Sequence, residues 1–422
     1  MTGPLPIAEA MTSQKITRGT PAYKRLCLAM LLAGLSTFAL LYCTQPLLPV
    51  FADEFGLTAE ESSLAVSLAT GPMAFVLLVA GVLSDRLGRR PIMIASLLAA
   101  SVMTALLAAL PGWYSLLAAR FACGLALAGV PAVAMTYISE EVEDGAVSHA
   151  MGLYIAGSAV GGMSGRLLVS LLTDFLDWRT ALGLTGVAGL AMGAMFWRTL
   201  PPSRAFEPRP VSLTGYVGGF REVFADRALP WLFLLAFMFM GGFISIYNYV
   251  GFRLLAPPYS LGQSAVGAIF LLYLVGSASS AISGAASGRY GPRRSLWAPI
   301  VIFLAGIGLT AAEPLFVIVV GIAVVTAGFF GAHAIASSWV GRRAGHHRAQ
   351  ATACYLFCYY MGSSVLGSVG GYAWTHGGWM GVSMFAALLI ALGLLVSLRL
   401  IRVKPLDRRP GEAIEEDPIP AD

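Results

Sequence analysis

Charged residues are scarce in this sequence. Asp, Glu, Lys and Arg make up 12% of its 422 residues, whereas hydrophobic residues make up 57%. Soluble domains contain roughly 25% charged residues, so this composition excludes an ordinary soluble protein. A helix that crosses a bilayer needs about 20 mostly apolar residues, because the hydrocarbon layer is about 30 Å thick. Twelve segments meet this requirement and predict an all-α membrane protein, with spans at residues 26–47, 62–84, 91–110, 113–137, 149–172, 179–199, 230–251, 264–287, 295–312, 315–339, 351–373 and 379–400.

Cysteine is also rare, and the sequence lacks the patterns that carry chemistry. Its five Cys residues all fall inside predicted spans, where we interpret them as packing residues rather than as disulfides or metal ligands. We find no nucleophile–base set, metal-ligand spacing or phosphate-binding loop, so we expect neither an enzyme nor a cofactor. A nucleotide-binding domain is missing as well, which argues against direct use of ATP.

Positive charge is concentrated on one side of the predicted membrane. The net charge of +5 could indicate a nucleic-acid-binding protein, but 23 of the 27 Lys and Arg residues fall in the two ends and in alternate loops. Cytoplasmic segments of membrane proteins carry such an excess. We therefore predict a multi-pass protein of the cell (inner) membrane with both termini in the cytoplasm, surrounded by lipid and not bound to nucleic acid.

The chain divides into two similar halves. A shift of 203 positions places five residues that follow span 2 on five that follow span 8, namely Gly81, Ser84, Arg86, Gly88 and Arg90 on Gly284, Ser287, Arg289, Gly291 and Arg293. A shift of 205 does the same for "YIAGSAVGGMSG" in span 5 and "YYMGSSVLGSVG" in span 11. The near-constant offset predicts two parallel six-helix repeats around a central cavity. The predicted division is a cytoplasmic tail at 1–24, a bundle at 25–199, a cytoplasmic loop at 200–229, a bundle at 230–402 and a cytoplasmic tail at 403–422.

At this point the chain resembles the major facilitator superfamily. "GVLSDRLGRRP" is similar to the superfamily's loop signature after span 2, and "ARFACGLALAG" to the signature that places an Arg, here Arg120, in span 4. "GSAVGGMSGR" is similar to the signature of its drug:proton exporters, except that Gly162 replaces the usual Pro and Arg166 the usual last Gly. The resemblance is closest to bacterial inner-membrane efflux-type members. It implies a monomeric secondary transporter that exports a small organic solute in exchange for protons by alternating access.

Two charged loops are candidates for gating the transporter. The first contains Gly81, Asp85, Arg86, Gly88, Arg89 and Arg90, and the second contains Gly284, Arg289, Gly291, Arg293 and Arg294. Gly88 and Gly291 can adopt a positive φ in a tight turn, and membrane topology alone could explain Arg89 and Arg90. Topology does not explain Asp85, whose counterpart is Gly288. The resemblance implies that Asp85 grips the second half near the start of span 11 in the outward-facing state.

Polar residues inside the spans are candidates for the translocation path, because charges in hydrocarbon are costly. Arg120 could bind a substrate anion, or it could hold the first bundle together by capping backbone carbonyls. We expect Arg166 to lie near the outer face and to extend its charge into the membrane interface. The other candidates are Gln45, Tyr247, Asn248 and His333.

Each of these other candidates has a structural alternative. Gln45 could line the cavity or stabilise a kink at Pro46. Tyr247 and Asn248 could orient a solute or belong to an aromatic belt, and His333 could carry protons or serve only as a hydrogen-bonding group. A last set of residues is expected to bend or pack the helices: Gly129, Pro131, Gly157, Gly161, Gly162 and Gly165.

Acidic residues are absent from spans 1 and 4, where many proton-coupled relatives have one. Proton coupling therefore follows from the resemblance alone, and the sequence assigns no coupling residue. Two alternatives stay open. One is a facilitator or importer of an organic anion that uses Arg120 and Arg166, and the other is a membrane receptor or scaffold that transports nothing.

Overall fold

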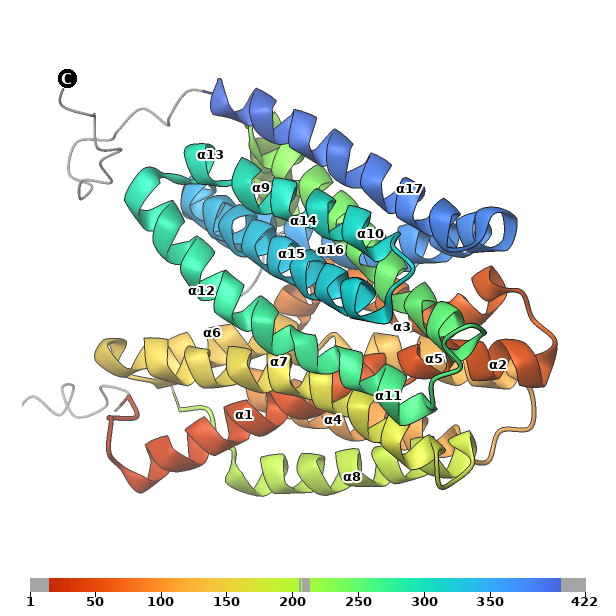
Figure 1. Ribbon diagram of the computed structural model, residues 1–422. Coiled ribbons are helices and arrows are strands. Elements are labelled where there is room, and N and C mark those ends of the chain that lie inside the picture. The colour runs from red at the N-terminus through yellow and green to blue at the C-terminus, as the bar shows by residue number, and fades with distance from the viewer. Residues whose placement is uncertain (1–14, 205, 207–212, 404–422) are drawn as a thin grey trace, which may run out of the picture.

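The computed structural model describes residues 15–204, 206 and 213–403, and the described chain is almost entirely helical (Figure 1). Most of the two predicted tails lies outside these residues. Eleven helical segments are long and apolar enough to cross a membrane. The last of them, Gly345–Ile401, contains both predicted spans 11 and 12, because its helix continues through a sharp bend at Gly378 (φ 55°, ψ −147°). The described chain therefore makes the twelve predicted crossings.

The N-terminal half forms the first six crossings, and two of these crossings are helices with a break. Its elements are α1 (Pro21–Tyr42), η2 (Gln45–Leu47), α2 (Leu48–Phe55), α3 (Ala59–Leu87), α4 (Arg89–Leu106), α5 (Trp113–Leu127), α6 (Pro131–Glu141), α7 (Asp144–Thr173) and α8 (Trp178–Thr199). The first crossing breaks after Tyr42, just before Pro46, and the fourth breaks before Pro131. Proline has no N–H to continue the preceding helix, which explains both positions.

The C-terminal half repeats this arrangement after a linker. Its elements are α10 (Leu229–Leu255), α11 (Gln263–Gly267), η3 (Ala268–Leu272), α12 (Tyr273–Tyr290), α13 (Pro292–Ser295), α14 (Trp297–Thr310), α15 (Leu315–Arg343), η4 (Gly345–His347), α16 (Arg348–Met361), the π-helical turn η5 (Gly362–Leu366) and α17 (Gly367–Ile401). The linker itself holds a helix, α9 (Leu213–Ala225), inside the segment that we expected to be a polar loop. Apolar residues recur along "LTGYVGGFREVFA" at helical spacing, so the sequence carried this signal.

Glycines let the helices of the first bundle approach closely. Gly157, Gly161 and Gly165 lie four residues apart on α7 and face the backbone of α1, where an added Cβ would collide with Leu31, Leu35 and Ala39. Such contacts between small residues replace the hydrophobic driving force that is missing between helices in lipid.

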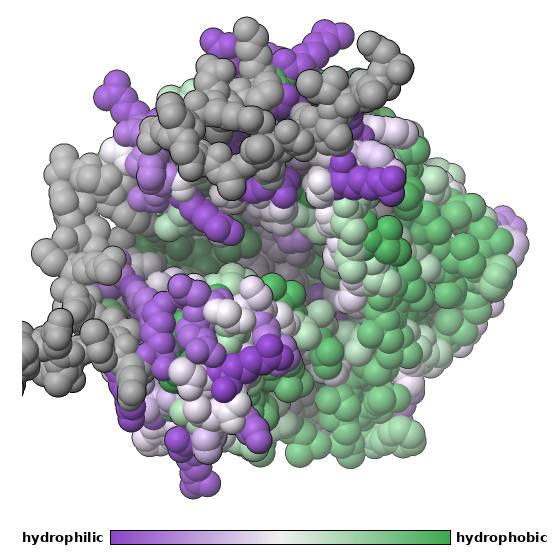
Figure 2. All heavy atoms as spheres, turned by 90° about the vertical axis from the view of Figure 1, so that its left-hand side faces the viewer, coloured by the Kyte–Doolittle hydropathy of each residue, from purple (hydrophilic) through white to green (hydrophobic). Residues whose placement is uncertain are grey.

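The molecule has two distinct ends. We call the end where α1 begins and α17 finishes the terminal end, and the opposite end, which carries α2 and α11, the far end (Figure 1). Figure 2 views the terminal end and shows a hollow between the two halves, rimmed by hydrophilic residues. The hydrogen bonds that the structure describes between the two halves involve residues of the far-end half of the molecule, for example Glu60 with Thr375 and Asp174 with the backbone N–H groups of Gln263 and Ser264.

Candidate functional site

Two amide side chains, one from η2 and one from α10, join the two halves. Gln45 donates a hydrogen bond through Nε2 to Oδ1 of Asn248 over 2.7 Å, and both side chains are buried. The two residues are 203 positions apart, which is the repeat offset. They are therefore equivalent positions of the two repeats, and we call their contact the amide bridge.

Arg166 holds the amide bridge from the N-terminal half. Its Nε donates to Oε1 of Gln45 over 2.5 Å, and its Nη1 donates to the carbonyl of Gly162. Arg166 is only 2% exposed, so the expected extension of its charge into the membrane interface is not found. Among the described residues, no carboxylate pairs with it.

The roles of the amide atoms follow from Arg166. A guanidinium can only donate hydrogen bonds, so Gln45 must present its oxygen to Arg166 and its nitrogen to Asn248. Asn248 must then accept with its oxygen. This leaves Nδ2 of Asn248 as a buried donor that has no hydrogen-bond partner in the described part of the chain.

Aromatic side chains surround the guanidinium. The Arg166 Cζ atom lies 4.1 Å from the ring centroid of Tyr42, 5.1 Å from that of Phe270 and 5.0 Å from that of Tyr273. Cations are stabilised over aromatic faces at such distances. Two of the three rings come from the C-terminal half, so the charge of one half is covered by rings of the other.

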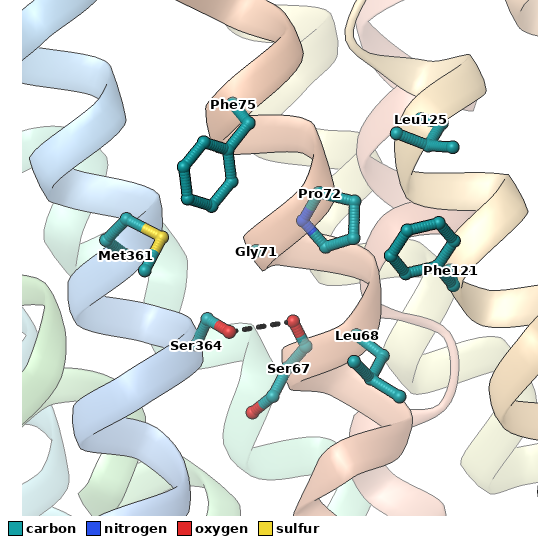
Figure 3. Close-up of a pocket in the computed structure, with 9 residues that line it drawn as sticks. All are labelled: Ser67, Leu68, Gly71, Pro72, Phe75, Phe121, Leu125, Met361 and Ser364. Carbon is teal, nitrogen blue, oxygen red and sulfur yellow. Dashed lines mark hydrogen bonds between the residues drawn. The ribbon is translucent and has the colours of Figure 1, made fainter.

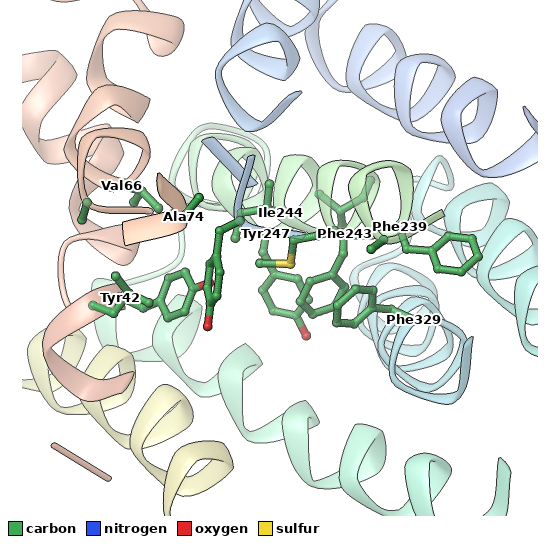
Figure 4. Close-up of a cluster of buried hydrophobic side chains, with 14 of the residues drawn as sticks. Tyr42, Val66, Ala74, Phe239, Phe243, Ile244, Tyr247 and Phe329 are labelled. Atoms are coloured by element: carbon green, nitrogen blue, oxygen red, sulfur yellow. The ribbon is translucent and has the colours of Figure 1, made fainter. Parts of the chain in front are cut away.

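The aromatic surface extends through the C-terminal half. Phe243 stacks on Phe329 with a centroid distance of 3.9 Å, and Tyr247 contacts Phe243 and Phe270. In Figure 4, Tyr42 points from the N-terminal half toward the row formed by Tyr247, Phe243 and Phe329. The Tyr247 hydroxyl is bonded to Thr326 over 2.7 Å. This bond ties the candidate Tyr247 into its own bundle.

His333 continues this surface on α15. Its Nδ1 lies 2.9 Å from the hydroxyl of Tyr355, and its ring stacks on Phe329 and lies 4.8 Å from the ring of Tyr359. His333 is partly exposed. It is not in contact with Arg166 or the amide bridge, so the structure places it apart from the other candidates.

Arg120 is enclosed on all sides and does not reach the hollow. It is 0% exposed and donates to the carbonyls of Ala65 over 2.8 Å, of Leu40 over 3.0 Å and of Leu41. Leu40 and Leu41 belong to the last turn of α1, whose carbonyls have no helical partner because the helix breaks there. Of the two interpretations that the sequence left open, this geometry favours the one in which Arg120 holds the first bundle together by capping backbone carbonyls.

The first charged loop forms an ion cluster within its own half. Arg89 pairs with Asp85 over 2.6 Å and with both oxygens of Glu140, over 2.9 Å to Oε1 and 3.1 Å to Oε2. Arg90 donates to the carbonyls at the end of α8. Membrane topology alone therefore does not explain the presence of Arg89 and Arg90. Arg86 is exposed. The grip of Asp85 on the second half, which we expected of the outward-facing state, is not made in this structure and stays a prediction.

The second charged loop repeats the turn but not the cluster. Gly88 and Gly291 both have a positive φ, of 90° and 80°. The positions equivalent to Asp85 and Arg89 are Gly288 and Pro292, which carry no charge. Arg289 and Arg294 are exposed, as is Gly284.

The second half is instead tied to the linker. Arg343 of α15 donates to Oδ1 of Asp226 over 2.7 Å, and this oxygen also accepts from the backbone N–H groups of Ala228 and Leu229 over 2.7 and 2.9 Å. Burial of the Asp226 carboxyl would raise its pKa, but the guanidinium and the two N–H groups outweigh burial and lower the pKa of Asp226.

A groove on the flank of the molecule follows the seam between the halves at α3 and α16. It has a volume of about 410 Å³, and Figure 3 shows Phe75, Pro72 and Phe121 of one half facing Met361 and Ser364 of the other. Phe75 and Phe121 are exposed, as side chains that meet lipid tails would be. Ser364 crosses the seam to the carbonyl of Ser67 over 2.9 Å.

Comparison with known proteins agrees with this architecture. The profile of the Major Facilitator Superfamily matches residues 26–262 and 254–421. The chain belongs to the major facilitator superfamily. It is 45% identical over 395 residues to the inner membrane transport protein YnfM of Escherichia coli (strain K12), covering 92% of this chain and 94% of YnfM. It is 43% identical over 399 residues to the uncharacterized MFS-type transporter YybF of Bacillus subtilis (strain 168), covering 93% and 98%.

Solved structures show the same fold. A bacterial homologue of the human lysosomal transporter Spinster, in an inward-facing and unoccupied conformation, matches with a TM-score of 0.75 at 16% identity, covering 92% of this chain and all of that one. The nucleoside transporter NupG matches with a TM-score of 0.74 at 16% identity, covering 89% and 99%. The chain is therefore a multi-pass membrane transporter of the major facilitator type and not an enzyme, which answers the receptor or scaffold alternative.

Proposed function

We propose that this transporter moves a small organic solute by alternating access, as a monomer whose terminal end faces the cytoplasm. The charge distribution supports this orientation, because 19 of the 23 Lys and Arg residues that the structure describes lie in the segments at that end or in the membrane helices that reach it. With this orientation the hollow of Figure 2 opens to the cytoplasm and the amide bridge closes the periplasmic side. The conformation is then inward-facing.

The observation that carries the proposal is the amide bridge between equivalent positions of the two repeats. A contact on the pseudo-symmetry axis must break when the two bundles rock apart at the far end, and a transporter of this architecture alternates by such rocking. Two glycines also show that the halves are in close contact at the far end. An added Cβ at Gly267 would collide with Ser170 of the opposite half, and one at Gly371 would collide with Glu60.

We further propose that the transport is export driven by the proton gradient, as the sequence resemblance implies. Acidic residues are absent from spans 1 and 4. His333 is the candidate proton carrier, because an imidazole can bind and release a proton and the side chain lies partly exposed on the aromatic surface. Its contacts there are Tyr355, Tyr359 and Phe329, so a proton on His333 would meet no fixed counter-ion among these neighbours.

A proteoliposome experiment tests transport and coupling together. Purified protein is reconstituted with a panel of labelled anionic, neutral and cationic solutes, and an inside-acidic or inside-alkaline pH gradient is imposed. We expect at least one solute to accumulate against its gradient and a protonophore to abolish this accumulation. Movement that ignores the pH gradient would leave a facilitator, and movement of no solute would contradict the proposal.

His333→Gln separates coupling from transport. Glutamine keeps a hydrogen-bonding side chain of similar reach but cannot bind a proton in this range. We expect downhill exchange to persist and accumulation driven by the pH gradient to be lost. Gradient-driven accumulation at the original rate in His333→Gln would remove His333 from the coupling path.

A further inference from the structure

We infer that the substrate is an organic carboxylate with a hydrophobic, ring-sized body, and that its carboxylate binds Arg166 beside the amide bridge. This inference rests on the proposed transport function and names the class of solute. The evidence comes from three features of the site: an unpaired cation, two donors without partners, and a surrounding of aromatic rings.

The first feature is the buried guanidinium of Arg166. A buried charge is tolerated when it is paired or fully hydrogen-bonded, and Arg166 is 2% exposed without a carboxylate partner among the described residues. Nε and Nη1 are bonded to Gln45 and Gly162. For Nη2 the described residues provide no hydrogen-bond partner, so this nitrogen is left to donate to a ligand, and a carboxylate that also reaches Nε competes there with Gln45. Arg120 contrasts with this arrangement, because Nε, Nη1 and Nη2 of its guanidinium each donate to a backbone carbonyl.

A second free donor lies on the other half. Nδ2 of Asn248 is buried and lacks a partner among the described residues, and Asn248 is linked to Arg166 through the single residue Gln45. Leaving a buried donor unsatisfied costs about 1–3 kcal/mol. A carboxylate has two oxygens that only accept hydrogen bonds, so it satisfies donors of this kind. An amine or a quaternary ammonium ion would add a second positive charge beside Arg166.

The aromatic surroundings select the rest of the solute. Tyr42, Phe270 and Tyr273 lie around the guanidinium, and rings continue from there through the C-terminal half (Figure 4). On this surface the hydroxyl of Tyr247 is hydrogen-bonded to Thr326, and the hydroxyl of Tyr355 to His333. An apolar or aromatic body would contact the rings directly.

The same arrangement connects binding to the amide bridge. Arg166 orients Gln45 so that its nitrogen points to Asn248. A carboxylate on Arg166 competes with the oxygen of Gln45 for the guanidinium and frees Gln45 to turn. Substrate binding thus weakens the contact that closes the far end, which is the response that alternating access requires of a substrate.

The test is ligand binding to the purified full-length protein in detergent, measured by thermal shift and tryptophan fluorescence. Four probes separate charge from body: 3-phenylpropionate, 3-phenylpropanol, 3-phenylpropylamine and acetate. We expect 3-phenylpropionate to raise the melting temperature in a saturable manner, and we expect the neutral, cationic and ringless probes to bind at least about tenfold more weakly.

Three variants at the site and one control assign the effect. Arg166→Lys keeps the charge but loses the planar fork, so binding should weaken about tenfold or more, and Arg166→Gln should abolish it. Gln45→Glu keeps the shape of the side chain and offers Arg166 an internal carboxylate, so it should also abolish binding while the protein still elutes as one monodisperse species. Arg179→Gln, at an arginine paired with Glu54 outside the site, should bind as the unmodified protein does.

Several results would overturn the inference. These are equal binding of the anionic, neutral and cationic probes, no binding of 3-phenylpropionate, or binding that survives in Arg166→Gln or Gln45→Glu. The proteoliposome panel distinguishes a failure of the carboxylate inference from a failure of the proposed transport function. Transport of a neutral or cationic solute without anion binding would contradict only the carboxylate, whereas Arg166-dependent anion binding without any transport would contradict only alternating access.

Discussion

Gln45 and Asn248 occupy equivalent positions in the two halves, yet their surroundings differ. Gln45 is held by Arg166, whereas Nδ2 of Asn248 has no hydrogen-bond partner among the residues that the structure describes. By the offset of 205 that relates spans 5 and 11, the counterpart of Arg166 is Gly371, which has no side chain and packs on the backbone of Glu60. The duplication has preserved the backbone frame, while the two halves have diverged in what they place at the centre.

The two halves contribute different kinds of side chain to the centre of the molecule. The N-terminal half contributes the buried cations Arg120 and Arg166, and the C-terminal half contributes most of the central aromatic rings. At the terminal end the same inequality recurs, because Arg89 forms its ion cluster in one half where the other has Pro292. The N-terminal half thus holds buried, hydrogen-bonded arginines at its centre, and the C-terminal half presents an aromatic surface.

Arg120→Ala tests the difference between the halves most strongly, because it removes a buried cation of the N-terminal half. The substitution removes three hydrogen bonds that the guanidinium donates to buried carbonyls, and hydrogen bonds to a charged group contribute about 1.5–3 kcal/mol each. We expect the free energy of unfolding to fall by about 3 kcal/mol or more, with a large loss of folded protein and of any transport in parallel. Size-exclusion chromatography after heating measures the effect.

Arg120→Lys and Arg179→Ala are the controls for that experiment. Lysine keeps a charge but cannot reach three carbonyls in a fixed plane, so an intermediate loss is expected, whereas Arg179 lies at the surface and should tolerate alanine. A stable Arg120→Ala protein that has lost only substrate binding would return Arg120 to the translocation path.

Arg89→Gln tests the ion cluster of the first half. Its side chain is 8% exposed and bonds to two acids, so its removal leaves Asp85 and Glu140 facing each other without a cation. We expect a loss of about 2–3 kcal/mol in unfolding free energy. Arg294→Gln in the second loop is the matched control, because Arg294 is exposed. Equal losses from the two substitutions would erase the difference between the loops.

Gly371→Ala sharpens the comparison at the position equivalent to Arg166. The added methyl group would collide with the backbone of Glu60 across the seam, and overpacking of this kind costs about 1–3 kcal/mol. Because the collision exists only while the far end is closed, the substitution should shift the protein toward the outward-facing state. Labelling of a single cysteine at Ser264, in a background where the five native Cys are replaced, should become roughly five- to hundredfold faster.

Gly377→Ala is the control for this shift, because space around Gly377 is open. Unchanged labelling in Gly371→Ala would mean that the far end does not open, which contradicts alternating access more directly than a failed transport assay would.

The sequence predicted the architecture better than the site, for physical reasons. Spans, repeats and the positive φ of Gly88 and Gly291 follow from local chemistry that any window of the sequence contains. The breaks after Tyr42 and before Pro131 are also local, because proline marks them.

The site could not be read in this way because its contacts are distant in sequence. Arg166 meets Tyr42 and Tyr273 only after three helices have packed, and neither tyrosine stood out as a candidate. A signal for the amide bridge did exist, since Gln45 and Asn248 differ by the repeat offset of 203. A polar pair at equivalent repeat positions near the symmetry axis is a pattern that sequence reasoning could have used.

The smallest effect is expected from Asp226→Asn, which tests how the second half is tied to the linker. Asparagine retains an oxygen for the N–H groups of Ala228 and Leu229 but loses the charge that Arg343 contacts. The pKa of Asp226 is lowered in the folded protein, so its ionised form contributes stability that is fully present above the ordinary value of about 3.9 and is lost as the pH falls through the lower folded value.

Thermal unfolding at two pH values therefore distinguishes the ion pair from the cap. At pH 7 we expect Asp226→Asn to cost about 1 kcal/mol, and below about pH 3 the difference from the unmodified protein should shrink as Asp226 itself becomes neutral. Glu222→Gln on α9, where the exposed carboxylate of Glu222 pairs with His347, should change stability little at pH 7. A cost for Asp226→Asn that persisted unchanged into acid would assign the role of Asp226 to its hydrogen bonds with the N–H groups of Ala228 and Leu229 and not to its ion pair with Arg343.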